Sequence, residues 1–159
     1  MRLTRIILET TIQAPRERCF DLSRSIDLHM ASTTHTNEIA VAGRTRGLIE
    51  QDEVVTWQAT HFFKRRELTS RIIEMKRPYY FTDVMVEGPF ASMVHVHTFT
   101  QDADTTRMQD EFLYAVPWGW FGKLVNFLFL RRYMVRLLKT RNLYIREVAE
   151  SATWRQYIF

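Results

Sequence analysis

Histidine and carboxylate side chains recur at alternate positions in the second half of the chain. His95 and His97 are two residues apart, Asp83 precedes them, and Asp110 lies in the next alternating segment. A histidine paired with a carboxylate can exchange a proton near neutral pH, because its pKa lies close to that pH. Two imidazoles on one strand face can also bind zinc if His61 or Asp110 supplies a third ligand. The spacing therefore admits acid–base chemistry, metal binding or mutual pairing in a core.

These residues lie between residues 36 and 117, where apolar and polar residues alternate as in half-buried strands. The alternation predicts six strands, at residues 37–42, 53–62, 67–75, 79–87, 92–101 and 106–116. Gly43 to Gly47, Lys64-Arg65-Arg66, Arg77-Pro78, Gly88-Pro89 and Asp102 to Thr105 are expected to connect them. Connections this short make neighbouring strands antiparallel.

The position of each turn predicts which residues face one another across the strands. A turn centred on residues 103–104 sets His97 opposite Asp110 and Phe99 opposite Met108. The turn at residues 88–89 sets Asp83 opposite His95, or one step diagonal from it. A register change of one residue would move these side chains to the other face of the sheet and destroy the match.

Other elements flank this region. Residues 3–13 predict a strand, and Ala14-Pro15 begins a short helix, because proline at the first helical position gives up only an unpartnered amide. A second short helix is expected over residues 26–31. After Pro117 the apolar residues recur every three or four positions, which predicts a helix over residues 120–150 with Met134 and Arg141 on its apolar stripe.

This order of elements resembles the SRPBCC superfamily, which includes START-like lipid-transfer domains, pollen-allergen-like proteins and bacterial polyketide cyclase/dehydrase-type domains. The local motifs that carry the resemblance are residues 55–62 (VTWQATHF), 81–83 (FTD), 88–90 (GPF), 95–99 (HVHTF) and 105–117. The resemblance implies an α+β helix-grip fold, in which a curved seven-stranded antiparallel sheet wraps around a long C-terminal helix and two short helices follow strand 1. It also implies a cavity for an apolar ligand between sheet and helix. Residues 1–150 are expected to form this single domain and residues 151–159 a short tail.

Within that fold, we expect the bulkier, more aromatic face of each strand to look toward the cavity. The candidate ligand contacts are Trp57, His61, Phe81, Asp83, Met85, Met93, Phe99, Met108 and Phe112 from the sheet, with Met134 and Arg141 from the helix. The candidate proton-transfer residues are His97, Asp110, His95 and Tyr114. We expect no metal and no cofactor, because two histidines at this spacing are a weak zinc signal and the superfamily's pockets are usually metal-free.

Three interpretations of the histidine–aspartate row stay open. The side chains satisfy one another inside a roomy core, or Arg141 or a histidine holds the polar head of a carboxylate, enol or phenol. In an enzyme, a paired histidine near Tyr114 would move protons in a cyclisation or dehydration. We expect non-catalytic binding of a lipid, quinone or polyketide-like molecule. A cyclase/dehydratase-like enzyme is the first alternative, and a protein- or membrane-interaction module is the second.

The net charge of +4 is unevenly distributed. Residues 118–159 hold 8 Lys/Arg against 2 Asp/Glu, whereas residues 1–117 hold 14 against 16. Trp118–Leu130 is apolar on every side, so our hypothesis is that it forms the cavity mouth and contacts a membrane or a partner, with Arg131 and Arg132 at anionic headgroups in the membrane case. A homodimer through this segment, or through Trp154, Tyr157 and Phe159, is equally compatible with the sequence. No nucleic-acid-binding motif accompanies the charge, so nucleic acid is not an expected partner.

Composition narrows the class of protein. With 46% hydrophobic and 13% aromatic residues, the 159-residue chain is a folded domain rather than a disordered one. The apolar run after Met1 is too short for a secretory signal, and Trp118–Leu130 is shorter than the roughly 20 residues that span a bilayer. Cys19 is the single cysteine and can form no internal disulfide. We therefore expect a cytoplasmic protein, of bacterial origin by the resemblance.

Overall fold

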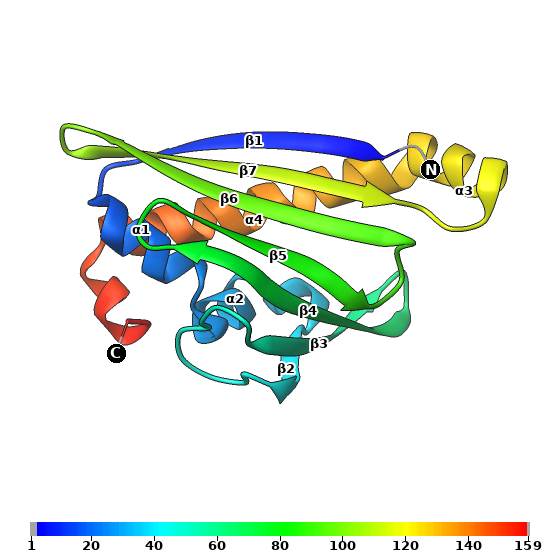
Figure 1. Ribbon diagram of the computed structural model, residues 1–159, viewed down its shortest axis with the longest axis horizontal. Helices are drawn as coiled ribbons and strands as arrows, with labels where there is room; N and C mark the ends of the chain where they lie inside the picture. Colours follow the sequence, from blue (N-terminus) through cyan, green and yellow to red (C-terminus); the bar gives the residue numbers. More distant parts are fainter. Residues whose placement is uncertain (1–2, 159) are drawn as a thin grey trace.

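A seven-stranded antiparallel sheet curves around a long C-terminal helix, as Figure 1 shows. The structure is a computed structural model and describes residues 3–158. The strands are β1 (Thr4–Ile12), β2 (Ile39–Gly43), β3 (Val54–His61), β4 (Lys64–Lys76), β5 (Tyr80–Glu87), β6 (Ser92–Asp102) and β7 (Thr105–Ala115), in the spatial order β1-β7-β6-β5-β4-β3-β2. The helices are α1 (Arg16–Ser23), α2 (Ile26–Ser32), η1 (Thr34–Thr36), α3 (Gly119–Val125), η2 (Asn126–Leu130), α4 (Arg131–Glu150) and η3 (Ala152–Gln156). The predicted α+β helix-grip fold is confirmed.

The predicted strand register is confirmed as well. His97 pairs with Asp110 and Phe99 with Met108 between β6 and β7, and Asp83 pairs with His95 between β5 and β6. On β6 buried and half-buried residues alternate from Ser92 to Phe99, so the face that carries the two histidines is the inner one. The side chains that could do chemistry therefore meet on the concave side of the sheet.

Irregular pairing gives the sheet its curvature. The register shifts between Ala40 and Ala42 on β2, and again at Ser70 and between Ile72 and Glu74 on β4. A β-bulge bends its strand and increases the local twist. The strands from β4 to β2 can therefore close over one side of α4.

One turn differs from its prediction. The sequence indicated that β3 runs through Phe62 and that Lys64 to Arg66 form the turn, but His61 pairs with Lys64 and the turn is Phe62-Phe63 alone. Both turn residues have positive φ, 49° and 64°, the pattern of the two-residue type I′ hairpin. Such a turn matches the twist of the flanking strands, so β4 begins three residues earlier than predicted.

The predicted single helix over residues 120–150 is interrupted. α3 and α4 are joined by the π-helical turn η2, whose first residue, Asn126, donates to Thr4 Oγ1 at 2.9 Å and accepts from the Tyr114 hydroxyl at 2.5 Å. Gly122 is required in α3, because a Cβ there would lie 1.9 Å from the Pro117 carbonyl oxygen. Among residues 3–158, no helix is long and apolar enough to cross a membrane.

Residues 151–158 pack against the body of the chain. Trp154 and Tyr157 lie against the core, the Arg18 guanidinium stacks over the Trp154 ring at 4.4 Å, and Ser25 Oγ donates to the Tyr157 carbonyl at 3.2 Å. Two of the three predicted dimer contacts are thus partly covered by their own chain. The third, Phe159, lies outside the described residues.

Two neighbouring positions on α4 test whether this helix is the centre of the core. Ile145 is fully buried and Leu143 is 52% exposed. We expect Ile145→Ala to lower the free energy of unfolding by about 2–5 kcal/mol through lost burial and a cavity. Leu143→Ala should change it by about 0.5 kcal/mol or less. Urea unfolding measures both, and equal effects would contradict the assignment of the buried face.

Candidate functional site

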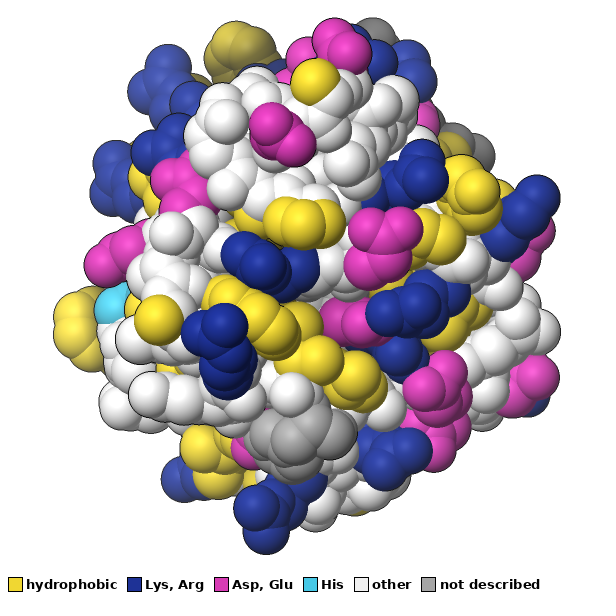
Figure 2. All heavy atoms as spheres, turned by 90° about the vertical axis from the view of Figure 1, so that its left-hand side faces the viewer, with side chains coloured by type: hydrophobic (Ala, Val, Ile, Leu, Met, Phe, Trp, Pro, Cys, Tyr) yellow, Lys and Arg dark blue, Asp and Glu magenta, His cyan; other side chains and the backbone are white. Residues whose placement is uncertain are grey.

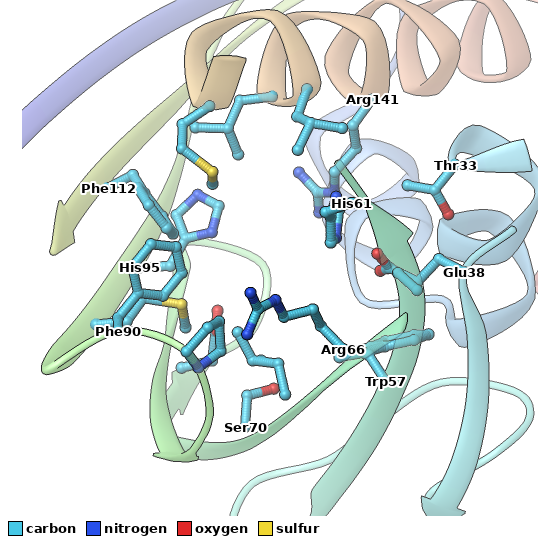
Figure 3. Close-up of a pocket in the computed structure, with 18 of the residues that line it drawn as sticks. Thr33, Glu38, Trp57, His61, Arg66, Ser70, Phe90, His95, Phe112 and Arg141 are labelled. Carbon is cyan, nitrogen blue, oxygen red and sulfur yellow. The ribbon is translucent and has the colours of Figure 1, made fainter. Parts of the chain in front are cut away.

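A cavity of about 560 Å³ lies between the inner face of the sheet and α4 (Figure 3). Its volume falls in the range of about 300–1,000 Å³ that is typical of small-molecule sites. Most of its surface is aromatic or aliphatic, with Phe81, Phe90, Phe112 and Leu138 among the lining residues. The cavity is where the predicted fold places one.

Most of the predicted contact residues line this cavity. They are Trp57, His61, Phe81, Asp83, Met93, Phe112, Met134 and Arg141, and the two histidines His95 and His97 line it too. Three others lie outside it, contrary to the prediction. Phe99 and Met108 are covered by α1, where Phe99 packs on Phe20 with ring centroids 5.3 Å apart, and Met85 packs beside Leu68 in a neighbouring apolar cluster.

Two of the predicted proton-transfer residues do not reach the cavity either. The Tyr114 side chain is fully buried and its hydroxyl donates to Asn126, which fixes the turn between α3 and α4. Asp110 is fully buried behind the two histidines. Its effect on anything in the cavity is therefore exerted through His95 and His97.

Four titratable side chains from three strands form a single cluster, in which Asp83 is half-buried and the other three are buried. Asp110 Oδ1 lies 2.8 Å from His95 Nε2 and 2.9 Å from His97 Nδ1, and His97 Nε2 lies 3.1 Å from Asp83 Oδ1. The contact between His97 Nδ1 and Asp110 lacks hydrogen-bond alignment, so it is electrostatic. The centroids of the two imidazole rings are 3.8 Å apart.

Helix α4 completes the cluster from the other side. Asn142 Nδ2 donates to Asp110 Oδ2 at 2.6 Å, and an Arg141 guanidinium nitrogen lies 3.7 Å from Asp110 Oδ1. Arg141 also donates to the Ser23 carbonyl at 2.9 Å. The carboxylate of Asp110 therefore joins β7 to β6 and to the gripping helix. No pattern in the sequence singles out Asn142, which lies beside Arg141 on the same turn.

Burial and charge set the protonation states of the cluster. Burial acts to raise the pKa of Asp110, but the contacts with both histidines outweigh it and hold that pKa well below its usual range. The pKa of Asp83 is lowered in the same way by His97. Burial acts to lower the pKa of His97, yet the two carboxylates raise it, whereas burial and the charge of His97 lower the pKa of His95.

These directions give the cluster a nearly balanced set of charges. The ionised carboxylates of Asp83 and Asp110 face Arg141 and His97. Of the two histidines, His97 keeps its proton to the higher pH. An ionised carboxylate only accepts hydrogen bonds, so the neutral His95 carries its proton on Nε2, toward Asp110. Its Nδ1 is then a lone-pair acceptor on a ring that lines the cavity.

The opposite wall carries a second polar group that sequence analysis largely missed. His61 Nδ1 lies 2.5 Å from the Tyr133 hydroxyl, and His29 contacts the Glu38 carboxylate and stacks on Trp57 at 4.1 Å. Burial lowers the pKa of His61. Burial acts to raise the pKa of Glu38, but His29 outweighs it and lowers that pKa. No periodic pattern marks Glu38, which precedes β2 by one residue.

Arg66 is a further polar residue at the cavity. It pairs with Ala59 across β3 and β4, so the two side chains share the inner face, and Figure 3 shows its guanidinium directed into the cavity. Among residues 3–158 no carboxylate pairs with it. The sequence predicts a turn at residues 64–66, so it does not assign Arg66 to a strand face. With the turn at Phe62-Phe63, the pairing of Arg66 with Ala59 assigns it to the inner face.

The cluster also contains a set of side chains that could hold a cation. Asp83, His95 and His97 each offer a ligand atom, all within 4.8 Å of one another. However, a cation would have to displace the proton that links His97 to Asp83, and it would lie near the positive charge of Arg141. The arrangement therefore suits a proton network better than a metal.

Comparison with known proteins establishes the fold. No protein-family model and no curated protein matches the sequence. Protein TTHA0849 from Thermus thermophilus is similar in structure, with a TM-score of 0.72 at 19% identity over 92% of this chain and 99% of that one. Major latex-like protein 151 from Panax ginseng has a TM-score of 0.68 at 14% sequence identity, over 92% of this chain and 97% of that one. Protein CV1439 from Chromobacterium violaceum has a TM-score of 0.69 at 10% sequence identity, again over 92% of this chain and 97% of that one. These matches confirm the helix-grip fold.

Removal of the central negative charge tests the cluster. Asp110→Asn keeps the shape of the side chain but removes one of the two carboxylates that compensate the positive charges of His97 and Arg141. We expect the free energy of unfolding at neutral pH to fall by about 3–5 kcal/mol. Asp104→Asn, in the exposed turn between β6 and β7, should change it by about 0.5 kcal/mol or less. Urea unfolding measures both changes. An equal change in the free energy of unfolding for the two variants would contradict the role of Asp110 in the cluster.

The raised pKa of His97 predicts a pH dependence. The stabilisation from protonated His97 is fully present below its unfolded pKa of about 6.5 and is lost as pH rises through its native pKa. In Asp110→Asn that native pKa should fall, because one of the two carboxylates that raise it is gone. NMR titration of the imidazole signals measures this shift. Titration of His97 at an ordinary pKa in the wild-type protein would contradict the assignment.

Proposed function

We propose that the chain binds a small amphipathic molecule, a lipid, quinone or polyketide-like compound, in the cavity between sheet and helix. The observation that carries this proposal is the shape and lining of the cavity, about 560 Å³ of mainly apolar wall with a few converging polar groups. Such a lining encloses an apolar body and orients it through a small number of hydrogen bonds. A core that served only stability would be filled to close packing.

The positions of the polar groups in the cavity indicate how an amphipathic ligand is oriented. His95 offers Nδ1 as an acceptor to a hydroxyl, enol or phenol, while Phe81, Phe112 and Met93 surround the apolar body. Arg66 offers a guanidinium to an anionic group. Arg141 is the weaker candidate for this role, because it already donates to the Ser23 carbonyl and to Asn142.

One observation favours a second function, proton transfer in a cyclisation or dehydration. Asp110 fixes the His95 ring through Nε2, and the lowered pKa of His95 keeps Nδ1 unprotonated toward the cavity. A general base needs this orientation and protonation state. His95→Gln distinguishes the two functions, because a carrier would keep its ligand with altered affinity whereas an enzyme would lose turnover and keep binding.

Filling the cavity tests the binding function. Ala59 is buried in the cavity wall, and its neighbour Thr60 points outward and is exposed. With 11-(dansylamino)undecanoic acid as a fluorescent probe, we expect Ala59→Phe to weaken binding about tenfold or more, because an overfilled site costs about 1–3 kcal/mol. Thr60→Phe should bind like the wild type. Equal affinity of the Ala59→Phe variant and the wild type would contradict the cavity as the binding site.

The role of Arg66 predicts a preference for anions. Arg66→Gln should weaken binding of the dansyl fatty acid about tenfold, a charge-assisted hydrogen bond being worth about 1.5–3 kcal/mol. The same variant should leave binding of the uncharged methyl ester unchanged, and Arg66→Lys should restore part of the lost affinity. Equal losses for acid and ester would show that Arg66 contributes packing rather than charge recognition.

A further inference from the structure

We propose that the end of the molecule where the cavity opens docks on an anionic lipid bilayer. We define the aromatic rim as the six aromatic side chains in this region that are more than 60% exposed. They are Phe62, Phe63, Trp118, Trp120, Phe127 and Phe129. This goes beyond ligand binding, because it assigns a partner to the outer surface at this end of the molecule.

The aromatic rim comes from two segments that lie at one end of the molecule. Phe62 and Phe63 form the turn between β3 and β4, and the other four side chains belong to residues 118–129. The segments meet at the start of α4, where the ring of Phe62 lies 4.7 Å from that of Tyr133. Phe62 and Trp118 line the cavity and are also largely exposed, which indicates that the cavity opens at this end.

The backbone holds three of these side chains outward in a strained conformation. Phe62, Phe63 and Trp118 have φ angles of 49°, 64° and 67°. This left-handed region is unfavourable for bulky residues, and asparagine or glycine is the usual choice in such a turn. Phe63 is fully exposed, so burial does not offset the strain there. Strain of this kind persists mainly where function requires it.

Within the two segments that carry the aromatic rim, the charged residues are all positive. Lys64 and Arg65 follow the first segment, and Lys123, Arg131 and Arg132 lie within or directly after the second. There is no Asp or Glu from residue 54 to residue 66, nor from residue 118 to residue 146. Exposed aromatic side chains beside Lys and Arg make up a surface that suits an anionic membrane interface. At the opposite end, shown in Figure 2, Lys and Arg are interspersed with Asp and Glu.

The same charges argue against a second copy of the chain as the partner. A two-fold dimer through the aromatic rim would bring two sets of unpaired cations together, because each copy presents the same surface. A bilayer with anionic headgroups instead supplies the opposite charge, and its interior accepts the aromatic rings. It would also bring the cavity opening to the surface from which an amphipathic ligand is exchanged.

Vesicle co-sedimentation of the ligand-free full chain tests the proposal. We expect binding to phosphatidylcholine vesicles that contain phosphatidylglycerol, and much weaker binding to phosphatidylcholine alone. Phe63→Ser/Trp120→Ser/Phe127→Ser, whose residues do not line the cavity, should reduce binding about tenfold or more. Ile73→Ser/Leu143→Ser, which removes exposed apolar side chains elsewhere, should bind like the wild type. Arg131→Glu/Arg132→Glu should abolish the preference for phosphatidylglycerol.

Two further measurements keep the outcomes separable. Binding of the dansyl fatty acid without vesicles should be the same for the triple serine variant and the wild type, so a failure of ligand binding is distinguished from a failure of docking. The wild type should sediment as a monomer in analytical ultracentrifugation. A dimer that the triple variant dissociates would overturn the proposal in favour of self-association. Absence of binding to either vesicle, or equal binding by the triple variant, would overturn it outright.

Discussion

The buried carboxylate of Asp110 is the constraint on which the rest of the structure depends. An ionised group with no exposed surface is tolerated only when partners compensate its charge and satisfy its hydrogen-bonding geometry. Those partners come from β6 and from α4, as His95, His97 and Asn142. One side chain therefore links the helix to the sheet and ties β7 to β6.

This arrangement also explains why space remains beside the cluster. The bulges in β2 and β4 bend the edge of the sheet over α4, while the polar contacts hold the helix at the level of β6 and β7. The enclosed volume is bordered by paired polar groups on two walls and by aromatic rings between them. Because Asp110 holds the proton of His95 on Nε2, the Nδ1 nitrogen of this cavity-lining ring stays unprotonated. Structural pairing and ligand recognition thus belong to one cluster rather than being alternatives.

Sequence patterns predict the strands and the register of β5, β6 and β7 well. The alternation of apolar and polar residues and the short turns leave few possible pairings. The pairing of His97 with Asp110 follows from them directly. Sequence patterns do not predict which inward-facing residues line the cavity, because tertiary packing decides this. Nothing in the alternation of β6 shows that α1 covers Phe99. They also fail where a turn has unusual residues. Phe62-Phe63 lacks the asparagine or glycine that is typical of a type I′ turn. The sequence therefore predicts the turn at residues 64–66, which leaves Arg66 outside the strands.

Native mass spectrometry of the purified chain, incubated with a total lipid and metabolite extract, tests the central claim most directly. We predict a single adduct of small-molecule mass that organic solvent releases, and no such adduct on the Ala59→Phe variant. Wild-type protein that carries no adduct, both as purified and after incubation, would contradict the claim that the space between sheet and helix is a ligand site.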